Sequence, residues 1–142
     1  MPSYMPKSVT DQWATPQLLF DEWDNKYHFD LDPAASSTNY KCAEWYGLDH
    51  PDPKRRNGLT ATWQAGAVWL NPPYGRAIAD WAKKAFESNI TTVMLLPVRT
   101  DTRWFHDYCK QFPITFIKGR VKFGESKSGA PFPSMIVEMG AR

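Results

Sequence analysis

The fold of this chain is decided by the stretch Ala67-Val68-Trp69-Leu70-Asn71-Pro72-Pro73-Tyr74-Gly75. Its first four residues are apolar without interruption, which is typical of a strand that is buried on both faces. The two prolines end this strand, because proline has no N–H to donate to a neighbouring strand. Residues 77–87 follow with apolar side chains at helical spacing, so the stretch predicts a buried strand, a rigid corner and a helix.

The same alternation continues on both sides of this stretch. Thr15 and Pro16 are typical of a helix start, with Thr15 as the N-cap, and Asp101 is a second candidate cap. The predicted helices are 16–26, 77–87 and 102–111, and the predicted strands are 29–32, 42–46, 67–70, 91–96, 114–118 and 135–139. Strands that alternate with helices predict an open α/β sheet, whose ligands bind beyond the carboxyl ends of the strands. Three such ends carry polar residues or proline: 32–34, 71–74 and 97–101.

The residues of the corner suit the methylation of a planar amine. An exocyclic amine on a base is a poor nucleophile, because its lone pair is delocalised into the ring. Acceptors on its two N–H groups pull the nitrogen toward a tetrahedral shape, and the candidates are the Asn71 side-chain oxygen and the Pro72 carbonyl. Pro72 and Pro73 keep the corner rigid, and Tyr74 offers a ring that can stack on the base. A plain proline-rich turn is the alternative.

Several motifs along nearly the whole chain resemble the phage-type DNA N-6-adenine methyltransferase family. In order they are Trp13-x-Thr15-Pro16, Phe29-Asp30-Leu31-Asp32-Pro33-Ala34, Asn57-Gly58-Leu59 before Trp63, Trp69-Leu70-Asn71-Pro72-Pro73-Tyr74-Gly75, Leu96-Pro97-x-Arg99-Thr100-Asp101-Thr102-x-Trp104-Phe105, Gly119-Arg120-x-x-Phe123 and Phe132-Pro133-Ser134. The resemblance implies S-adenosylmethionine as methyl donor and the N6 amine of an adenine flipped out of double-stranded DNA as acceptor. It also implies a compact Rossmann-like methyltransferase sheet with an antiparallel C-terminal strand. The catalytic residues would be Asn71, Pro72, Pro73 and Tyr74.

By the same resemblance, two segments line the cofactor pocket. They contribute Trp13, Thr15, Pro16, Asp32, Pro33 and Ala34. Asp49 is the candidate for the ribose hydroxyls and Asn57 for the cofactor's adenine; a surface acid and a turn residue are the alternatives. No glycine directly follows Asp32, where larger amino-methyltransferases have a glycine-rich loop, and only about 38 residues separate Asp32 from Asn71. One or more of the helices usual between these positions is therefore expected to be missing.

Two clusters of basic residues and one further arginine are candidates for DNA contacts, although the net charge is only +2. The candidates for phosphate contacts are Lys54, Arg55, Arg56, Arg99, Lys118, Arg120, Lys122 and Lys127. The alternatives are that the clusters are solvated turns and that Arg99 belongs to a helix cap or pairs with Asp101. Without room for a separate target-recognition domain, loops 36–63 and 124–133 are expected to read the DNA.

Size and composition narrow the remaining choices. The 142 residues are expected to form one methyltransferase domain, 1–142, and no apolar run reaches the ~20 residues of a membrane span. Residues 1–10 lack the apolar core of a signal peptide, so a cytoplasmic location is expected. Neither the three histidines nor Cys42 and Cys109 show metal spacing, so no metal is expected and both thiols are predicted to be buried.

Several alternatives for the function stay open. The same acceptor geometry serves cytosine N4, an RNA base or a protein glutamine. The missing glycine loop also fits a non-catalytic module that binds DNA or the cofactor. A second copy of the chain, in a homodimer, could supply further recognition surface.

Overall fold

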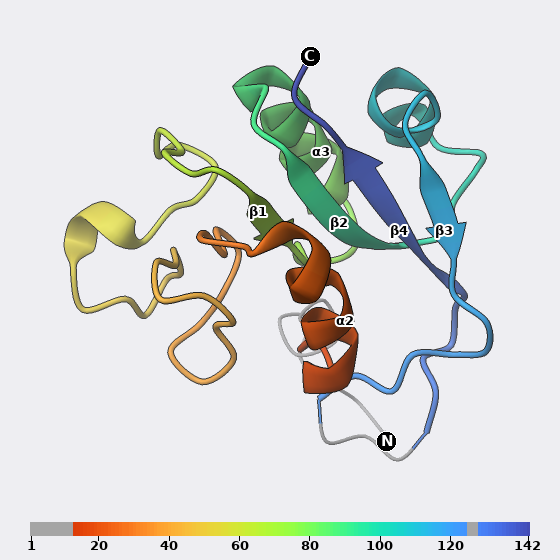
Figure 1. Cartoon of the computed structure of the whole chain (residues 1–142), viewed down its shortest axis with the longest axis horizontal. Coiled ribbons are helices and arrows are strands. Elements are labelled where there is room, and N and C mark those ends of the chain that lie inside the picture. The colour runs from red at the N-terminus through yellow and green to blue at the C-terminus, as the bar shows by residue number, and fades with distance from the viewer. Residues whose placement is uncertain (1–12, 125–127) are drawn as a thin grey trace.

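The computed structural model of the chain describes residues 13–124 and 128–142. Its centre is a four-stranded sheet (Figure 1) in the order β1 (Val68–Leu70), β2 (Thr92–Pro97), β4 (Ser134–Met139) and β3 (Ile114–Phe116). β1 and β2 are parallel, whereas β4 runs antiparallel to both β2 and β3. The α/β class and the antiparallel C-terminal strand predicted from the sequence are therefore confirmed.

The sheet positions the ends of two strands at one edge. β2 is buried along its whole length, and Val93 to Leu96 have no exposed surface. Because β1 and β2 are parallel and pair Leu70 with Met94, the residues after Leu70 and after Pro97 leave the sheet at the same edge. The corner predicted at 71–74 begins there.

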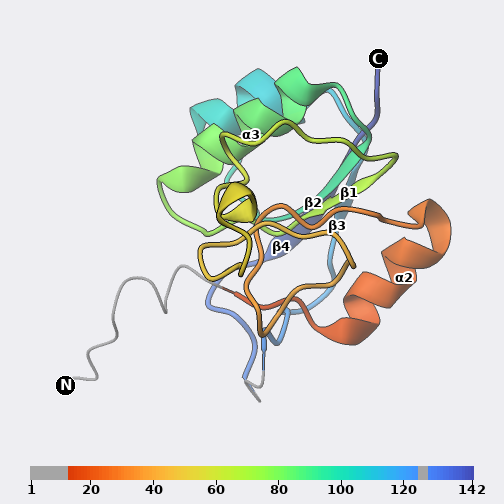
Figure 2. The same ribbon diagram turned by 90° about the vertical axis from the view of Figure 1, so that its left-hand side faces the viewer.

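Helices cover the sheet on both faces (Figure 2). α3 (Ala77–Ser88) and the π-helical turn η2 (Phe105–Cys109) lie on one face, and α2 (Gln17–Tyr27) lies on the other. Phe20 of α2 is buried, and its ring meets Trp69 edge-on with centroids 5.5 Å apart. α3 buries the apolar stripe predicted from the sequence, which consists of Ile78, Trp81, Ala82 and Ala85.

Two predicted strands are present only as single parallel bridges. Leu31 pairs with Val68, and Asp32 pairs with Trp45. The prediction of strands over 29–32 and 42–46 was therefore too long. Pro33 has no N–H to donate, so it ends the strand segment at 29–32. The segment at 42–46 then bridges to Asp32 alone. The bridges nevertheless place Asp32 next to β1.

Two predicted helix starts are wrong. The first helix begins at Gln17 with Pro16 as N-cap and no side-chain cap, because the Thr15 hydroxyl accepts hydrogen bonds from core side chains instead. The helix predicted at 102–111 is reduced to η2 and the two residues before it. There the Phe105 N–H donates to Thr102 Oγ1 at 3.3 Å, so Thr102 rather than Asp101 is the side-chain acceptor.

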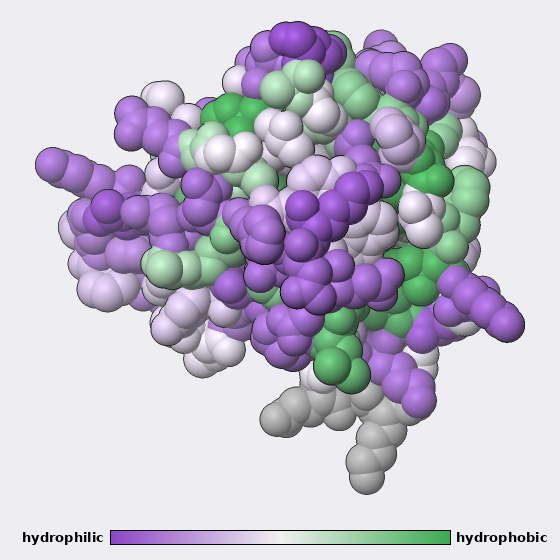
Figure 3. Space-filling model, in the orientation of Figure 1, coloured by the Kyte–Doolittle hydropathy of each residue, from purple (hydrophilic) through white to green (hydrophobic). Residues whose placement is uncertain are grey.

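Between Asp32 and β1 the chain forms loops with one short 3-10 helix, η1 (Pro53–Arg55), and no α-helix. In Figure 1 these loops lie beside β1, on the side away from β3. Their surface is largely hydrophilic in Figure 3. The sheet is thus flanked on its β1 side by loops, and these loops form much of the site.

Candidate active site

Two hollows adjoin the corner that follows β1. The first is a cavity of about 250 Å³, and the second is an open groove of about 810 Å³. Asn71, Pro72 and Pro73 line the cavity, whereas Tyr74 lines the groove. Trp13 lines both. The corner and Trp13 therefore form the boundary between the two hollows.

The segments predicted to meet at this edge of the sheet do so in two groups. Residues 32–36 line the cavity together with 46–48 and 56–59, and residues 97–99 line the groove together with 131–133. Of the residues predicted to bind the cofactor, Pro16 and Asp49 are not part of the cavity lining. Those that are part of it are Trp13, Thr15, Asp32, Pro33, Ala34 and Asn57.

Asn71 is held with its side-chain amide in one orientation. Its Nδ2 donates to the Trp13 carbonyl and, at 3.0 Å, to the Thr15 hydroxyl. A carbonyl only accepts, so the NH₂ group and not the oxygen has to face Trp13. The Asn71 Oδ1 is buried and has no hydrogen-bond partner within the described residues. Because buried acceptors are nearly always paired, this free oxygen at the corner points to a donor on a ligand.

Tyr74 belongs to the core as well as to the groove. It is 5% exposed, and its hydroxyl donates to the Leu95 carbonyl at 2.9 Å. Its ring meets Phe123 and Phe132 at steep angles, with centroids 6.1 and 5.5 Å apart. Burial raises the pKa of the Tyr74 phenol well above its usual value. The face predicted to stack on a base is therefore largely covered in this structure.

Asp32 is the only carboxyl that is buried in the described part of the chain. It is 4% exposed, lines the cavity, and accepts a hydrogen bond from the Lys41 N–H at 2.9 Å. Burial raises the pKa of Asp32 to about 7, and hydrogen bonds from the backbone of Lys41 and Ala34 oppose this rise. Both protonation states are therefore populated near neutral pH, and the ionised one can pair with a cation in the cavity.

Two glycines let the loops close on the turn that follows Asp32. A Cβ atom on Gly47 would lie 2.1 Å from the Ala35 carbonyl oxygen, and one on Gly58 would lie 2.0 Å from the Pro33 carbonyl oxygen. Any side chain at these positions would push the turn away. The turn itself contains no glycine, because the close approach is made by the glycines of the segments that pack onto it.

Asp49 and Asn57 both stabilise turns. Asp49 accepts hydrogen bonds from the Ser37 N–H and, at 2.6 Å, from the Ser37 hydroxyl, and these bonds lower its pKa. The Asn57 Oδ1 accepts from the Leu59 N–H at 3.0 Å. The structure therefore brings Asn57, but not Asp49, into the cavity lining.

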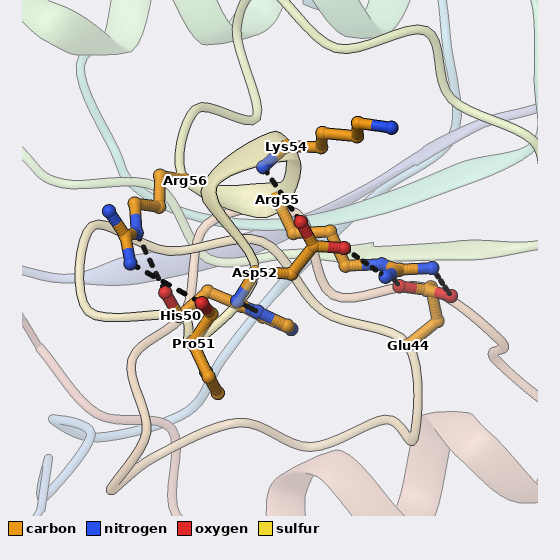
Figure 4. Close-up of polar contacts among 7 residues, drawn as sticks. All are labelled: Glu44, His50, Pro51, Asp52, Lys54, Arg55 and Arg56. Atoms are coloured by element: carbon orange, nitrogen blue, oxygen red, sulfur yellow. Dashed lines mark hydrogen bonds and ion pairs between the residues drawn. The ribbon is translucent and has the colours of Figure 1, made fainter.

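The basic cluster Lys54–Arg56 is largely engaged within its own loop (Figure 4). Arg55 pairs with Glu44 at 2.6 Å and with Asp52 at 2.7 Å, and Arg56 donates to two backbone carbonyls of the loop. Lys54 is exposed, and its ammonium group points away from these partners in Figure 4. Of the three cations, Lys54 is therefore the one placed best for a phosphate.

Two of the other basic candidates lie at the groove. Arg99 and Arg120 are exposed and line it. Lys118 and Lys122 are exposed on either side of Arg120, in the segment after β3. Lys127 lies outside the described residues.

The sequence model of one family, described as DNA N-6-adenine-methyltransferase (Dam), matches residues 2–137 of the chain. The chain belongs to this family. The match spans both hollows and the corner between them, so it confirms the resemblance seen in the motifs.

Two curated relatives of this Dam family chain carry the same description. The DNA N-6-adenine-methyltransferase of Haemophilus phage HP1 (strain HP1c1) is 36% identical over 108 residues, which are 72% of the chain and 58% of the relative. The DNA N-6-adenine-methyltransferase of Escherichia phage T1 is 37% identical over 105 residues, which are 70% of the chain and 41% of the relative. The chain thus spans about half the length of these relatives.

The cavity of this Dam family chain also contains residues that the sequence pattern did not single out. Trp81 reaches it from the buried face of α3, where its spacing indicates only a core position. Lys41 lies in an irregular loop and contributes its backbone N–H to Asp32. Leu48 lines the cavity while 82% exposed, and no local pattern marks it. These contacts arise from the way the loops fold over β1.

Other kinds of site have little support in residues 13–124 and 128–142. No group of three or more His, Cys, Asp or Glu side chains there could hold a metal ion. No helix in the same ranges is long and apolar enough to cross a membrane. Cys42 and Cys109 are buried free thiols, as predicted, and burial raises the pKa of each to about 12.

Proposed function

We propose that the chain transfers a methyl group to the N6 amine of adenine in DNA, with S-adenosylmethionine as the donor. Family membership supports DNA adenine methylation, and both curated relatives carry that name. The observation that carries the proposal is the Asn71 Oδ1, a buried acceptor without a partner in the described chain, at the boundary of two hollows. A methyl donor and a target base need two adjoining sites that meet at one such corner.

The cavity suits the cofactor in its chemistry. When bound, S-adenosylmethionine supplies an electrophilic methyl group on a positively charged sulfur, and it also carries an ammonium group. The buried Asp32 carboxyl forms no ion pair within the described residues, so it is available to a ligand cation. The other residues of the cavity lining that would contact the cofactor are Trp13, Pro33, Ala34 and Asn57.

The corner suits the target amine. The Asn71 oxygen and the Pro72 carbonyl would accept hydrogen bonds from the two N–H groups of the amine. These bonds would direct its lone pair toward the methyl group. Positive charge develops on the nitrogen as the new bond to carbon forms, and the two acceptors stabilise that charge. The methyl–sulfur bond would break with its electron pair left on the sulfur, and the excess proton of the amine would pass to water. Because both acceptors are fixed before the reaction, little reorganisation is needed.

The groove is the side on which we place DNA. It combines the aromatic residues Tyr74, Trp104 and Phe132 with the exposed Arg99 and Arg120. Aromatic rings can receive a base that has left the duplex, and arginines can contact phosphates. Since Tyr74 is 5% exposed, stacking of the adenine on it requires that the neighbouring rings move when DNA binds.

A single labelling experiment tests the proposal. The purified chain is incubated with tritiated S-adenosylmethionine and, in separate reactions, with double-stranded DNA, RNA or protein. Labelled nucleic acid is digested to nucleosides. We expect label in DNA alone, recovered as N6-methyldeoxyadenosine, and almost none with the Asn71→Ala variant.

The other outcomes identify the alternatives. Label in N4-methyldeoxycytidine, in RNA or in protein glutamine would assign the same corner to another planar nitrogen. Cofactor binding without transfer to any substrate would identify a non-catalytic binding module.

A further inference from the structure

Thr15 is a buried polar residue that joins the corner to the sheet. It is 5% exposed, and its Oγ1 lies 3.0 Å from Asn71 Nδ2 and 3.3 Å from Trp69 Nε1. Both nitrogens are donors only, so the hydroxyl accepts from both of them. We propose that Thr15 is a positioning residue that holds the Asn71 amide with its oxygen free for the target amine. This inference rests on the proposed function, since Thr15 would act in that reaction through Asn71.

The orientation of the Asn71 amide decides whether the corner can work. An asparagine amide has two ends of nearly the same shape and opposite hydrogen-bonding character. With its oxygen toward the target, Asn71 accepts a hydrogen bond from the amine. If the Asn71 amide were rotated by half a turn, its NH₂ group would face the N–H of the target amine. Two donors cannot form a hydrogen bond, so the amine would gain no stabilisation as it becomes positive.

Two hydrogen bonds oppose this rotation, and we call them the amide clamp. The Asn71 Nδ2 donates to the Trp13 carbonyl and to the Thr15 hydroxyl. Rotation would place the Asn71 oxygen against the carbonyl oxygen of Trp13, which is also an acceptor. The Trp13 half of the clamp is backbone, so Thr15 is the half that a substitution can remove.

The sheet fixes the position of Thr15 in turn. Trp69 has no exposed surface and pairs with Val93 in the β1–β2 register. Its buried indole N–H needs an acceptor, and the Thr15 hydroxyl is the acceptor that it has. The hydroxyl is therefore occupied by two donors from the core side, which explains why it does not cap α2.

The kinetic test compares Thr15→Val, which keeps the shape and removes the acceptor, with Thr15→Ser, which keeps the hydroxyl. We expect Thr15→Val to lower kcat for DNA methylation about tenfold or more, because a buried N–H loses its partner and the amide can rotate. The KM for DNA and the Kd for S-adenosylmethionine should stay within about threefold of the wild type. Thr15→Ser should keep most of the kcat. In an Asn71→Ala background, Thr15→Val should cause no further loss, since it acts through Asn71.

A second readout needs neither cofactor nor DNA. In ¹⁵N-labelled protein, the side-chain amide protons of Asn71 should exchange slowly with solvent in the wild type and in Thr15→Ser. They should exchange about tenfold faster in Thr15→Val, because one of their two hydrogen bonds is gone.

Three kinetic outcomes would overturn the proposal: an unchanged kcat in Thr15→Val, an equal loss in Thr15→Ser, or a weakened cofactor Kd with normal kcat. The last would make Thr15 a direct cofactor contact. If the wild type methylates DNA but the exchange rate of the Asn71 amide protons is the same in Thr15→Val as in the wild type, the amide clamp is wrong and the proposed function stands. If exchange depends on Thr15 but no DNA is methylated, the amide clamp stands and the proposed function fails.

Discussion

The cavity and the groove on the two sides of the corner at Asn71 differ in the groups that line them. The cavity is shaped by backbone turns, with Gly47 and Gly58 pressed onto the turn after Asp32, and it contains a buried carboxyl. The groove is open and lined by aromatic rings and exposed arginines. The first construction suits a small ligand held at close range, and the second suits a large polyanion. Among the described residues, Trp13 and the corner at 71–74 border both hollows. Substitutions in the cavity, at the corner and in the groove should therefore separate cofactor binding, rate and DNA binding.

On the cavity side, Asp32 should show the largest effect, through the dependence of stability on pH. Burial raises its pKa from 3.8 to about 7, which corresponds to about 4 kcal/mol. A raised pKa means that the folded protein binds the proton more tightly than the unfolded chain does. The contribution to the free energy of unfolding is therefore complete below pH 3.8 and is lost as the pH rises through about 7.

Urea unfolding of the wild type and of Asp32→Asn across this range measures the effect. The wild type should lose stability relative to the variant as the pH rises, by up to about 4 kcal/mol. The amide of the Asp32→Asn variant cannot replace every hydrogen bond of the carboxyl, and this adds a constant offset to the free energy of unfolding. The result is therefore how the difference between the two proteins changes with pH, and not its absolute value. A difference that does not change with pH would show that Asp32 titrates as in an unfolded chain.

At the boundary, Asn71→Ala should lower the rate and spare both binding steps. The Asn71 oxygen gains most as the amine becomes tetrahedral and positive, so its loss should reduce kcat about a hundredfold or more, on the order of 3 kcal/mol. Calorimetry with S-adenosylmethionine should give nearly the wild-type affinity. Near-normal turnover of this variant would remove the basis of the proposed function.

On the groove side, Tyr74 variants should affect capture of the base. Tyr74→Ala removes a stacking face worth roughly 1–3 kcal/mol and should raise the KM for DNA. Tyr74→Phe keeps the ring and loses the hydrogen bond to the Leu95 carbonyl, which should lower stability by about 1 kcal/mol and keep most activity. A mismatch opposite the target adenine lowers the cost of flipping. It should partly restore Tyr74→Ala and do little for Asn71→Ala.

The cavity should also respond to one added methyl group. Gly58→Ala would place a Cβ 2.0 Å from the Pro33 carbonyl oxygen, so the turn has to move and cofactor affinity should fall about tenfold. Gly66→Ala is the matched control, because its nearest neighbour is 3.6 Å away. Equal cofactor affinity in both variants, measured by calorimetry, would show that the turn does not shape the ligand site. DNA affinity should differ little between them.

The smallest effect is expected at the basic cluster of the loop. Lys54→Ala should reduce the slope of log K against log salt for DNA binding by about one, as for the loss of one phosphate contact. Arg55→Ala should leave that slope nearly unchanged and lower stability only slightly, since its ion pairs are half exposed and screened by solvent. Equal slopes for Lys54→Ala and the wild type would assign the whole cluster to the loop structure.

Parts of the site were predictable from sequence because they depend on neighbours in the chain. The apolar run of β1, its end before the corner at 71–74 and the buried stripe of α3 are local patterns, and all three are present. The predicted strands at 29–32 and 42–46 shrank to bridges, because strand length depends on the partner available. The helix predicted at 102–111 is also shorter and consists of η2 and the two residues before it, and its start differs because Thr102 and not Asp101 accepts the Phe105 N–H.

By itself, the sequence determined the family, the strand–corner–helix unit and the residue types at the corner. Only the tertiary structure decided that the Asn71 oxygen has no partner among the described residues. It also decided that Thr15 bonds to Trp69 and Asn71 rather than capping α2, and that distant glycines shape the turn after Asp32. The physical reason is that a residue's intrinsic conformation acts over a few neighbours. Its hydrogen-bond partners and close contacts come from segments that can be distant in the chain: Trp13 and Asn71 are 58 positions apart, and Lys26 and Glu138 are 112 positions apart.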